Sequence, residues 1–213
     1  MSLGEAEQRS IEERARRLEA RTGAEVVAAV VSRCHEHPEV PWKAFALGAA
    51  LAAVAMPLLG PRLGAWPTRP VPLGLSVLGA GGALAVLTLV WARFARLFLD
   101  GHRADAEVRR FGESLFLSRE LFRTPDRMGI LLLVSRFERR VVVLADAGVR
   151  ERVPEVELRP VVERMTRDLG AGRVAPALAA GLEALEALLI SRGFTGRGGA
   201  DAIPDELVEV RGP

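Results

Sequence analysis

Two long uncharged runs interrupt a chain in which apolar and charged positions otherwise alternate. Between Lys43 and Arg62 lie 18 residues without a charge, and between Arg69 and Arg93 lie 23. As helices these runs would be roughly 27 and 34 Å long, enough to cross the hydrocarbon core of a bilayer. The pattern predicts a transmembrane helical hairpin over residues 42–92, with spans at about 44–59 and 71–92.

Residues typical of a membrane interface flank both spans. Tryptophan prefers the boundary between headgroups and hydrocarbon, and basic side chains extend from span ends to the headgroups. Small residues, Gly48 with Ala52 and Gly79 with Ala83, would let the two helices approach closely. The alternative is a pair of apolar core helices in a soluble protein. The expected interface residues are Trp42, Lys43, Trp66, Trp91, Arg93 and Arg96.

Basic residues outside the spans predict the orientation of the hairpin. The loop between the spans has only Arg62 and Arg69. The segments that flank the hairpin are richer in positive charge, which by the positive-inside rule places both soluble pieces in the cytoplasm. No cleavable signal peptide is visible, because a charged stretch occupies residues 12–21. The flanking basic residues are Arg33, Lys43, Arg93, Arg96, Arg103, Arg109 and Arg110.

The remaining segments show helical and strand-like patterns in turn. Apolar residues recur at helical spacing in four segments, and short β-branched runs typical of buried strands form three others. A charged turn at 136–140 joins the last two strands and indicates a β-hairpin. The expected order is helix 5–21, strand 24–31, helix 104–122, strands 128–135 and 141–145, and helices 158–170 and 174–192.

This order predicts an α/β fold, in which a small mixed β-sheet is sandwiched by helices and the domain is interrupted by the transmembrane hairpin. Residues 1–33 and 101–194 would form one domain together, because one helix and one strand cannot bury a core alone. From residue 195 to 213, glycine and acidic residues without a periodic apolar face predict a flexible tail.

Composition narrows the possible functions. The chain has 29 basic and 27 acidic residues, a formal net charge of +2 and a pI near 9.4. This near balance does not produce the positive field that nucleic-acid binding requires, so we expect no nucleic-acid partner. The single cysteine, Cys34, cannot form an intramolecular disulfide. The sequence also lacks a P-loop, a phosphatase-type Cys–Arg motif and a Gly-x-Ser-x-Gly elbow.

Two carboxylates are candidates for a metal site. Asp126 precedes one strand of the predicted β-hairpin and Asp146 follows the other, so both would lie near its open end. Carboxylate and backbone oxygens there would suit calcium or magnesium. The alternative is structural: Asp126 would cap the turn after Pro125, and Asp146 would open an Asp-Ala-Gly turn.

A second candidate is a set of softer ligands near the hairpin ends. Cys34, His35, His37 and His102 would gather where the membrane hairpin leaves and re-enters the soluble domain, and this set would suit zinc. Histidine at such a place is also common as an amphipathic interface residue. Both readings remain open at the level of sequence.

Three stretches carry a resemblance to a known family: RTGAEVV, LFRTPDRMGILLLVSRFERRVVVLADAGV and DAIPDELVEV. The chain resembles the TPM domain, and among its members the bacterial inner-membrane subgroup with two inserted transmembrane helices. The resemblance implies an α/β/α sandwich, divalent-cation binding, weak acid-phosphatase behaviour, and assembly or maintenance of membrane complexes.

Two functional hypotheses follow from the resemblance and the residues together. The first is a membrane-anchored module that interacts with the lipid bilayer and with a membrane protein complex, in whose assembly or maintenance it takes part. It is motivated by the resemblance and by the missing catalytic motifs. The second is a divalent-cation-dependent phosphomonoesterase that uses Asp126 and Asp146.

Overall fold

The computed structural model describes residues 3–34, 37–63, 70–196 and 207–210. The chain divides into two compact units. One comprises Met1–His35 with His102–Pro213, and the other comprises Glu36–Gly101. The inserted unit contains the helical hairpin, and the split unit contains the whole β-sheet. The α/β domain is therefore assembled from two parts of the chain, one before and one after the hairpin.

The sheet has four strands in the order β3-β2-β1-β4. β1 runs parallel to both β2 and β4, whereas β2 and β3 form an antiparallel hairpin. This confirms the expected mixed sheet and the β-hairpin. The strands are β1 (Glu25–Val31), β2 (Gly129–Ser135), β3 (Arg140–Ala145) and β4 (Val208–Val210).

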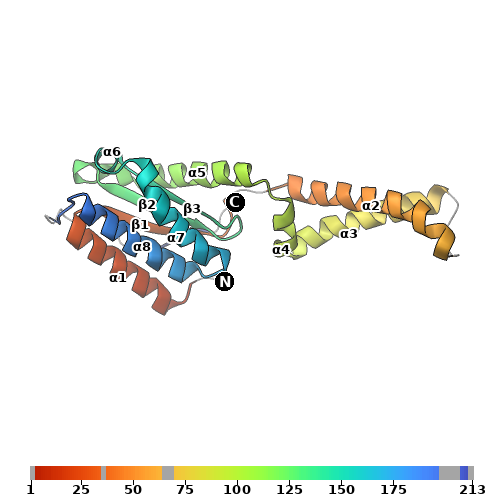
Figure 1. Cartoon of the computed structure of the whole chain (residues 1–213), viewed down its shortest axis with the longest axis horizontal. Helices are drawn as coiled ribbons and strands as arrows, with labels where there is room; N and C mark the ends of the chain where they lie inside the picture. The colour runs from red at the N-terminus through yellow and green to blue at the C-terminus, as the bar shows by residue number, and fades with distance from the viewer. Residues whose placement is uncertain (1–2, 35–36, 64–69, 197–206, 211–213) are drawn as a thin grey trace. The chain divides into compact units, whose positions relative to one another are not determined.

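Helices cover both faces of this sheet (Figure 1). Side chains alternate along β1, so that Val26 and Val30 join one hydrophobic cluster and Val27 and Val31 join the other. The first cluster is completed by α1 (Glu5–Thr22), α7 (Arg159–Gly170) and α8 (Val174–Ser191), and the second by α5 (Gly101–Ser118). The expected α/β/α sandwich is confirmed.

Short elements form the corners of the domain. They are η2 (Leu121–Arg123), η3 (Pro125–Arg127), α6 (Ala147–Arg150) and η4 (Glu155–Leu158). The helix expected over 104–122 instead begins at Gly101 and ends at Ser118. Glu120 follows with a φ of 53°, a left-handed conformation that a continuing α-helix cannot contain.

The expectation of a flexible tail over 195–213 differs from the structure at three residues. Val208–Val210 form β4 and pair in register with Ala29–Val31. The Glu209 carboxylate accepts a hydrogen bond from the Leu3 N–H at 2.7 Å, which joins the two ends of the chain. Strand pairing with a distant segment supplies order that a local glycine-rich composition does not reveal. Residues 197–206 and 211–213 lie outside the described part of the chain.

The inserted unit consists of α2 (Glu39–Leu63) and α3 (Pro70–Val90), followed by α4 (Ala92–Ala95) and η1 (Arg96–Phe98). α2 and α3 pack closely at Gly48, which has no side chain: a Cβ there would lie only 2.8 Å from the Ala80 carbonyl oxygen. On α3 the glycine at this contact is Gly81, whereas a Cβ on Gly79 would meet nothing within 4 Å. The contact through small residues was therefore predicted correctly at Gly48 on α2, whereas on α3 it lies at Gly81, two residues after the predicted Gly79.

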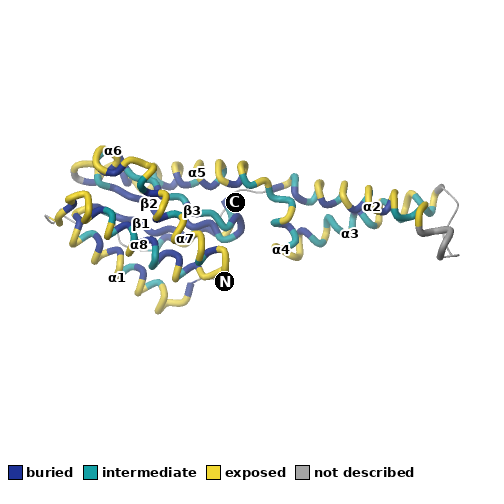
Figure 2. The backbone as a smooth tube through the Cα atoms, in the orientation of Figure 1, coloured by how far each residue is buried: buried dark blue, intermediate teal, exposed yellow. Residues whose placement is uncertain are grey.

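Three helices in the described residues are long and apolar enough to cross a membrane: α2, α3 and α8. Much of α8 is buried in the α/β domain, where Leu178, Leu182 and Leu185 pack in the core beneath the sheet. The two helices of the hairpin instead carry exposed apolar side chains, Leu51 and Leu75 among them, and Figure 2 shows exposed positions on both helices. Length and composition alone do not distinguish the three helices, but their burial does, because only α8 packs in the core of the α/β domain.

Candidate functional site

Asp146 lies at the end of β3, and its carboxylate is hydrogen-bonded to other residues of the domain. Its side chain is only 3% exposed. The Arg127 guanidinium donates from Nε to Oδ2 at 3.0 Å and from Nη2 to Oδ1 at 2.8 Å, and the Ala147 N–H donates to Oδ1 at 2.7 Å. Asp146 is thus the N-cap of α6 and the anchor for Arg127.

The backbone that presents Arg127 is held in an unusual conformation. Asp126 and Arg127 have φ values of 55° and 56°, in the left-handed region that costs residues with a Cβ about 1 kcal/mol or more each. Gly148 makes this possible, because a Cβ there would lie 2.1 Å from the Asp126 carbonyl oxygen. The corner is therefore a tightly determined structure built from two motifs that are distant in sequence.

This corner differs from the open carboxylate pair that the cation hypothesis requires. The Asp126 side chain is exposed, while both oxygens of Asp146 already accept hydrogen bonds. A cation at Asp146 would face the positive Arg127 guanidinium at hydrogen-bond distance. Within the described residues, no group of three or more His, Cys, Asp or Glu side chains could hold a metal ion. The contacts of Asp146 favour a structural role for this residue.

The charge state of Asp146 follows from these contacts. Burial alone would raise the pKa of its carboxyl, but hydrogen bonds from Arg127 and the Ala147 N–H, with the charges of Arg127 and Arg150, lower the pKa below the ordinary 3.8. A lowered pKa in the folded state stabilises the fold at pH values above the ordinary pKa, and this contribution is lost as the pH falls through the folded-state pKa.

Replacing Asp146 by alanine is expected to destabilise the full chain by about 2 kcal/mol at pH 7, because α6 loses its N-cap and Arg127 its acceptors. Asp146→Asn keeps an acceptor for the Ala147 N–H and should lose less. Denaturant unfolding in detergent measures both. The difference between wild type and Asp146→Asn should shrink as the pH falls below about 4; a difference that stays constant to pH 2 would contradict this account.

The second candidate set includes no group of three or more side chains that could hold a metal ion within the described residues. His35 lies outside them, and His37 belongs to the inserted unit, where its Nδ1 lies 3.5 Å from Glu39 Oε1. Cys34 and His102 belong to the α/β unit. Burial raises the pKa of the Cys34 thiol to about 12, because the buried site solvates the thiolate poorly.

Cys34 instead joins a buried polar cluster at the end of β1. Glu138 is 4% exposed, and its Oε1 accepts the Cys34 N–H at 3.1 Å while its Oε2 accepts the Ser135 hydroxyl. These bonds tie the β2–β3 turn to the segment that leads into the hairpin. The cluster thus supplies hydrogen-bond partners for the buried Glu138 carboxylate and the Cys34 N–H, as buried polar groups in a folded protein require.

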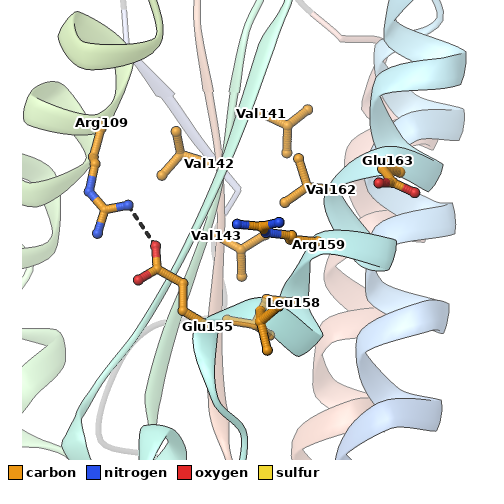
Figure 3. Close-up of a pocket in the computed structure, with 10 residues that line it drawn as sticks. Arg109, Val141, Val142, Val143, Glu155, Leu158, Arg159, Val162 and Glu163 are labelled. Atoms are coloured by element: carbon orange, nitrogen blue, oxygen red, sulfur yellow. Dashed lines mark hydrogen bonds and ion pairs between the residues drawn. The ribbon is translucent and has the colours of Figure 1, made fainter.

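A groove that was not expected from the sequence runs along the outer edge of β3, which pairs with no further strand among the described residues (Figure 3). It encloses about 550 Å³ between α5 on one side and η4 with α7 on the other. Its floor is apolar and its rim is charged. The lining residues are Arg109, Val141, Val142, Val143, Glu155, Val156, Leu158, Arg159, Val162 and Glu163. One signal could have indicated it: no strand was expected after the β-hairpin, which leaves its second strand at an edge.

An ion pair connects the two walls of the groove. Arg109 Nη1 donates to Glu155 Oε1 at 2.7 Å, and Arg109 Nε donates to Glu113 at 3.2 Å. The hydrogen bond and charge of Arg109 lower the pKa of Glu155, so the pair is charged at neutral pH. Because at least half of each side chain is exposed, the pair contributes at most about 1 kcal/mol and can open readily.

Comparison with known proteins places the α/β domain among characterised folds. A family model described as the TPM domain matches residues 97–188, from η1 to near the end of α8. The NMR structure of the BA42 protein from the psychrophilic bacterium Bizionia argentinensis has a TM-score of 0.60 and 12% sequence identity, covering 99% of this chain and 97% of that one. At this identity the likeness shows the fold alone. No curated protein matches the chain.

Proposed function

We propose that this protein is a membrane-anchored module of TPM type, which interacts with a membrane protein complex and takes part in its assembly or maintenance. The observation that carries the proposal is the exposed apolar surface of the α2–α3 hairpin, inserted between β1 and α5 of the domain. The two-span insertion also supports assignment to the bacterial membrane subgroup that the sequence motifs resemble.

The hairpin surface is unsuited to water. Leu51 and Val54 of α2 are 58% and 61% exposed, and Leu75 and Leu89 of α3 are 65% and 73% exposed. An exposed apolar surface of this kind marks a site of contact with a membrane or with another protein. In a bilayer the same side chains would face lipid, and the backbone groups are already paired within the helices.

The flanking residues support a position at the membrane boundary. Trp42 is 71% exposed and packs edge-on against Phe45, and Trp91 is 54% exposed and stacks on Phe94. The helix breaks at Trp91, whose backbone is extended. Arg93 is exposed, Arg96 half-buried, and Lys43 Nζ donates to the Phe98 carbonyl oxygen at 3.2 Å. Trp66 lies outside the described residues.

Anchoring and sidedness are tested together in cells. We expect the full chain to stay in the membrane pellet after alkaline carbonate extraction. A cysteine at exposed Glu151 should react with a membrane-impermeant maleimide only after the inner membrane is permeabilised, and a cysteine at Thr68, between the spans in sequence, should react before. Buried Cys34 should remain unlabelled. The reverse labelling order would contradict a cytoplasmic domain, and release by carbonate would contradict the anchor.

The interaction is tested at native expression levels. Crosslinking in intact cells, followed by purification in detergent, should recover one defined membrane complex in constant proportion to the protein. Recovery of the protein alone, in both crosslinked and untreated cells, would overturn the proposed role in an assembly.

A further inference from the structure

The outer edge of β3 presents backbone groups that the sheet does not use. The Asp146 N–H donates to the Gly129 carbonyl oxygen at 2.9 Å, and Ala145 stands opposite Ile130. In an antiparallel pair, bonded and non-bonded positions alternate. Val142 and Leu144 therefore bond to β2, while Val141 and Val143 direct their N–H and C=O groups away from it, into the groove.

An open strand edge of this kind is a template for another strand. The side chains of an added strand would alternate between the two faces of the sheet, so the strand would need a wall on each face. The groove provides both walls. On the α7 side, Val156 at the rim is 60% exposed and Leu158 is buried. On the α5 side the wall is formed by Arg109. The exposed ion pair between Arg109 and Glu155 crosses the groove, and the groove becomes accessible when this pair opens.

Two charged side chains of the groove point to the chemistry of the occupant. Arg159 and Glu163 line it; among the described residues neither side chain has a hydrogen-bond or ion-pair partner, and the charge of Arg159 acts on the nearby Glu155. They stand one helical turn apart on α7, a rise of about 6 Å. Alternate side chains on one face of a strand are about 6.7 Å apart. An acidic and a basic residue at positions i and i+2 of an extended segment would match them.

We propose that the β3 groove binds an extended segment of a partner protein by β-strand addition, with an acidic and a basic side chain two residues apart paired to Arg159 and Glu163. The inference rests on the proposed function for the kind of partner. Backbone bonds to Val141 and Val143 supply affinity, and the two charges supply specificity.

The test uses full-length protein in detergent and two labelled peptides, Thr-Val-Glu-Val-Lys-Val-Thr and Thr-Val-Lys-Val-Glu-Val-Thr, which differ only in the order of the charges. Fluorescence anisotropy should show that one of them binds about tenfold more tightly, whichever strand direction the groove selects. The double variant Arg159→Glu with Glu163→Arg should exchange this preference. Both residues are on the surface, so the variant should fold normally.

The backbone contribution has its own variants. Val143→Pro removes an outward N–H of an edge strand, where proline breaks no bond to β2, and should abolish binding of both peptides while the thermal unfolding of the chain remains cooperative. Peptides N-methylated at alternate residues should also fail to bind. Binding that survives N-methylation, a charge preference that the double variant does not exchange, or no binding by either peptide would each overturn the proposal.

Two further measurements separate this inference from other outcomes. Sedimentation of the full chain shows whether Val143→Pro dissociates a dimer; if it does, the groove joins two copies, and the proposed partner segment is wrong. Carbonate extraction of Val143→Pro and of the charge-exchange variant should match wild type. Loss of membrane anchoring in the wild type would overturn the proposed function, whereas the groove proposal would still be decided by the peptide-binding measurements.

Discussion

Gly148→Ala is expected to destabilise the α/β domain by about 3 kcal/mol or more, because it places a methyl group where backbone already lies. The new Cβ would be 2.1 Å from the Asp126 carbonyl oxygen and 3.0 Å from that of Arg127. Those atoms cannot withdraw easily, since Arg127 is held by two hydrogen bonds to Asp146. Denaturant unfolding of the full chain in detergent, followed by circular dichroism, measures the loss.

Gly170→Ala is the matched control for this substitution. A Cβ on Gly170 would meet nothing within 4 Å, and the residue lies in α7. Alanine there should leave stability unchanged or raise it by up to about 1 kcal/mol, since glycine is the weaker helix former. Equal stability of the Gly148→Ala and Gly170→Ala proteins would show that the corner is not packed as described.

Gly48→Leu is expected to separate the two helices of the hairpin. Its Cβ would lie 2.8 Å from the Ala80 carbonyl oxygen and 3.0 Å from the Gly81 Cα, so the larger side chain cannot be accommodated at this crossing. Helix association in a bilayer depends on close van der Waals packing, which leucine here would remove. Spin labels at exposed Ala50 and Ala83 in the reconstituted full chain should report a longer and broader distance distribution.

Gly79→Leu makes the same chemical change on the outer side of α3. A Cβ there would meet nothing within 4 Å, so leucine should extend into lipid and leave the distance distribution as in wild type. If both variants behave alike, the hairpin does not pack through Gly48 and Gly81. If only Gly79→Leu disturbs the distances, the face of α3 assigned to the contact is wrong.

The hairpin shows which features of a helix pair the sequence pattern predicts and which it does not. Two uncharged runs predicted both helices, and the flanking charges predicted where they end to within a few residues. The contact on α3 was not predictable, because Gly79, Gly81 and Gly82 are all small residues on neighbouring faces. Which of them meets Gly48 depends on the rotation of one helix about its axis, and apolar residues on all sides leave that rotation unmarked.

The candidate site shows a similar limit. Strand ends correctly indicated that Asp126 and Asp146 belong to one region, but not that Arg127, which follows Asp126 and shares its left-handed conformation, would bind the Asp146 carboxylate. Arg127 is adjacent in sequence to Asp126, but nothing in the local pattern marks it as the partner of Asp146. A buried carboxylate needs hydrogen-bond donors, and the residue that supplies them is chosen by the folded backbone.

The sequence by itself determined the order of the main elements, the mixed sheet and the two long apolar helices of the hairpin, because helical and strand periodicities and long uncharged runs are local properties of the chain. Only the tertiary structure decided the pairing of Val208–Val210 with β1, the occupation of Asp146 by Arg127 and the groove along β3. Each of these depends on segments that are far apart in sequence, and which donors, acceptors and strand edges remain free is settled only when those segments meet.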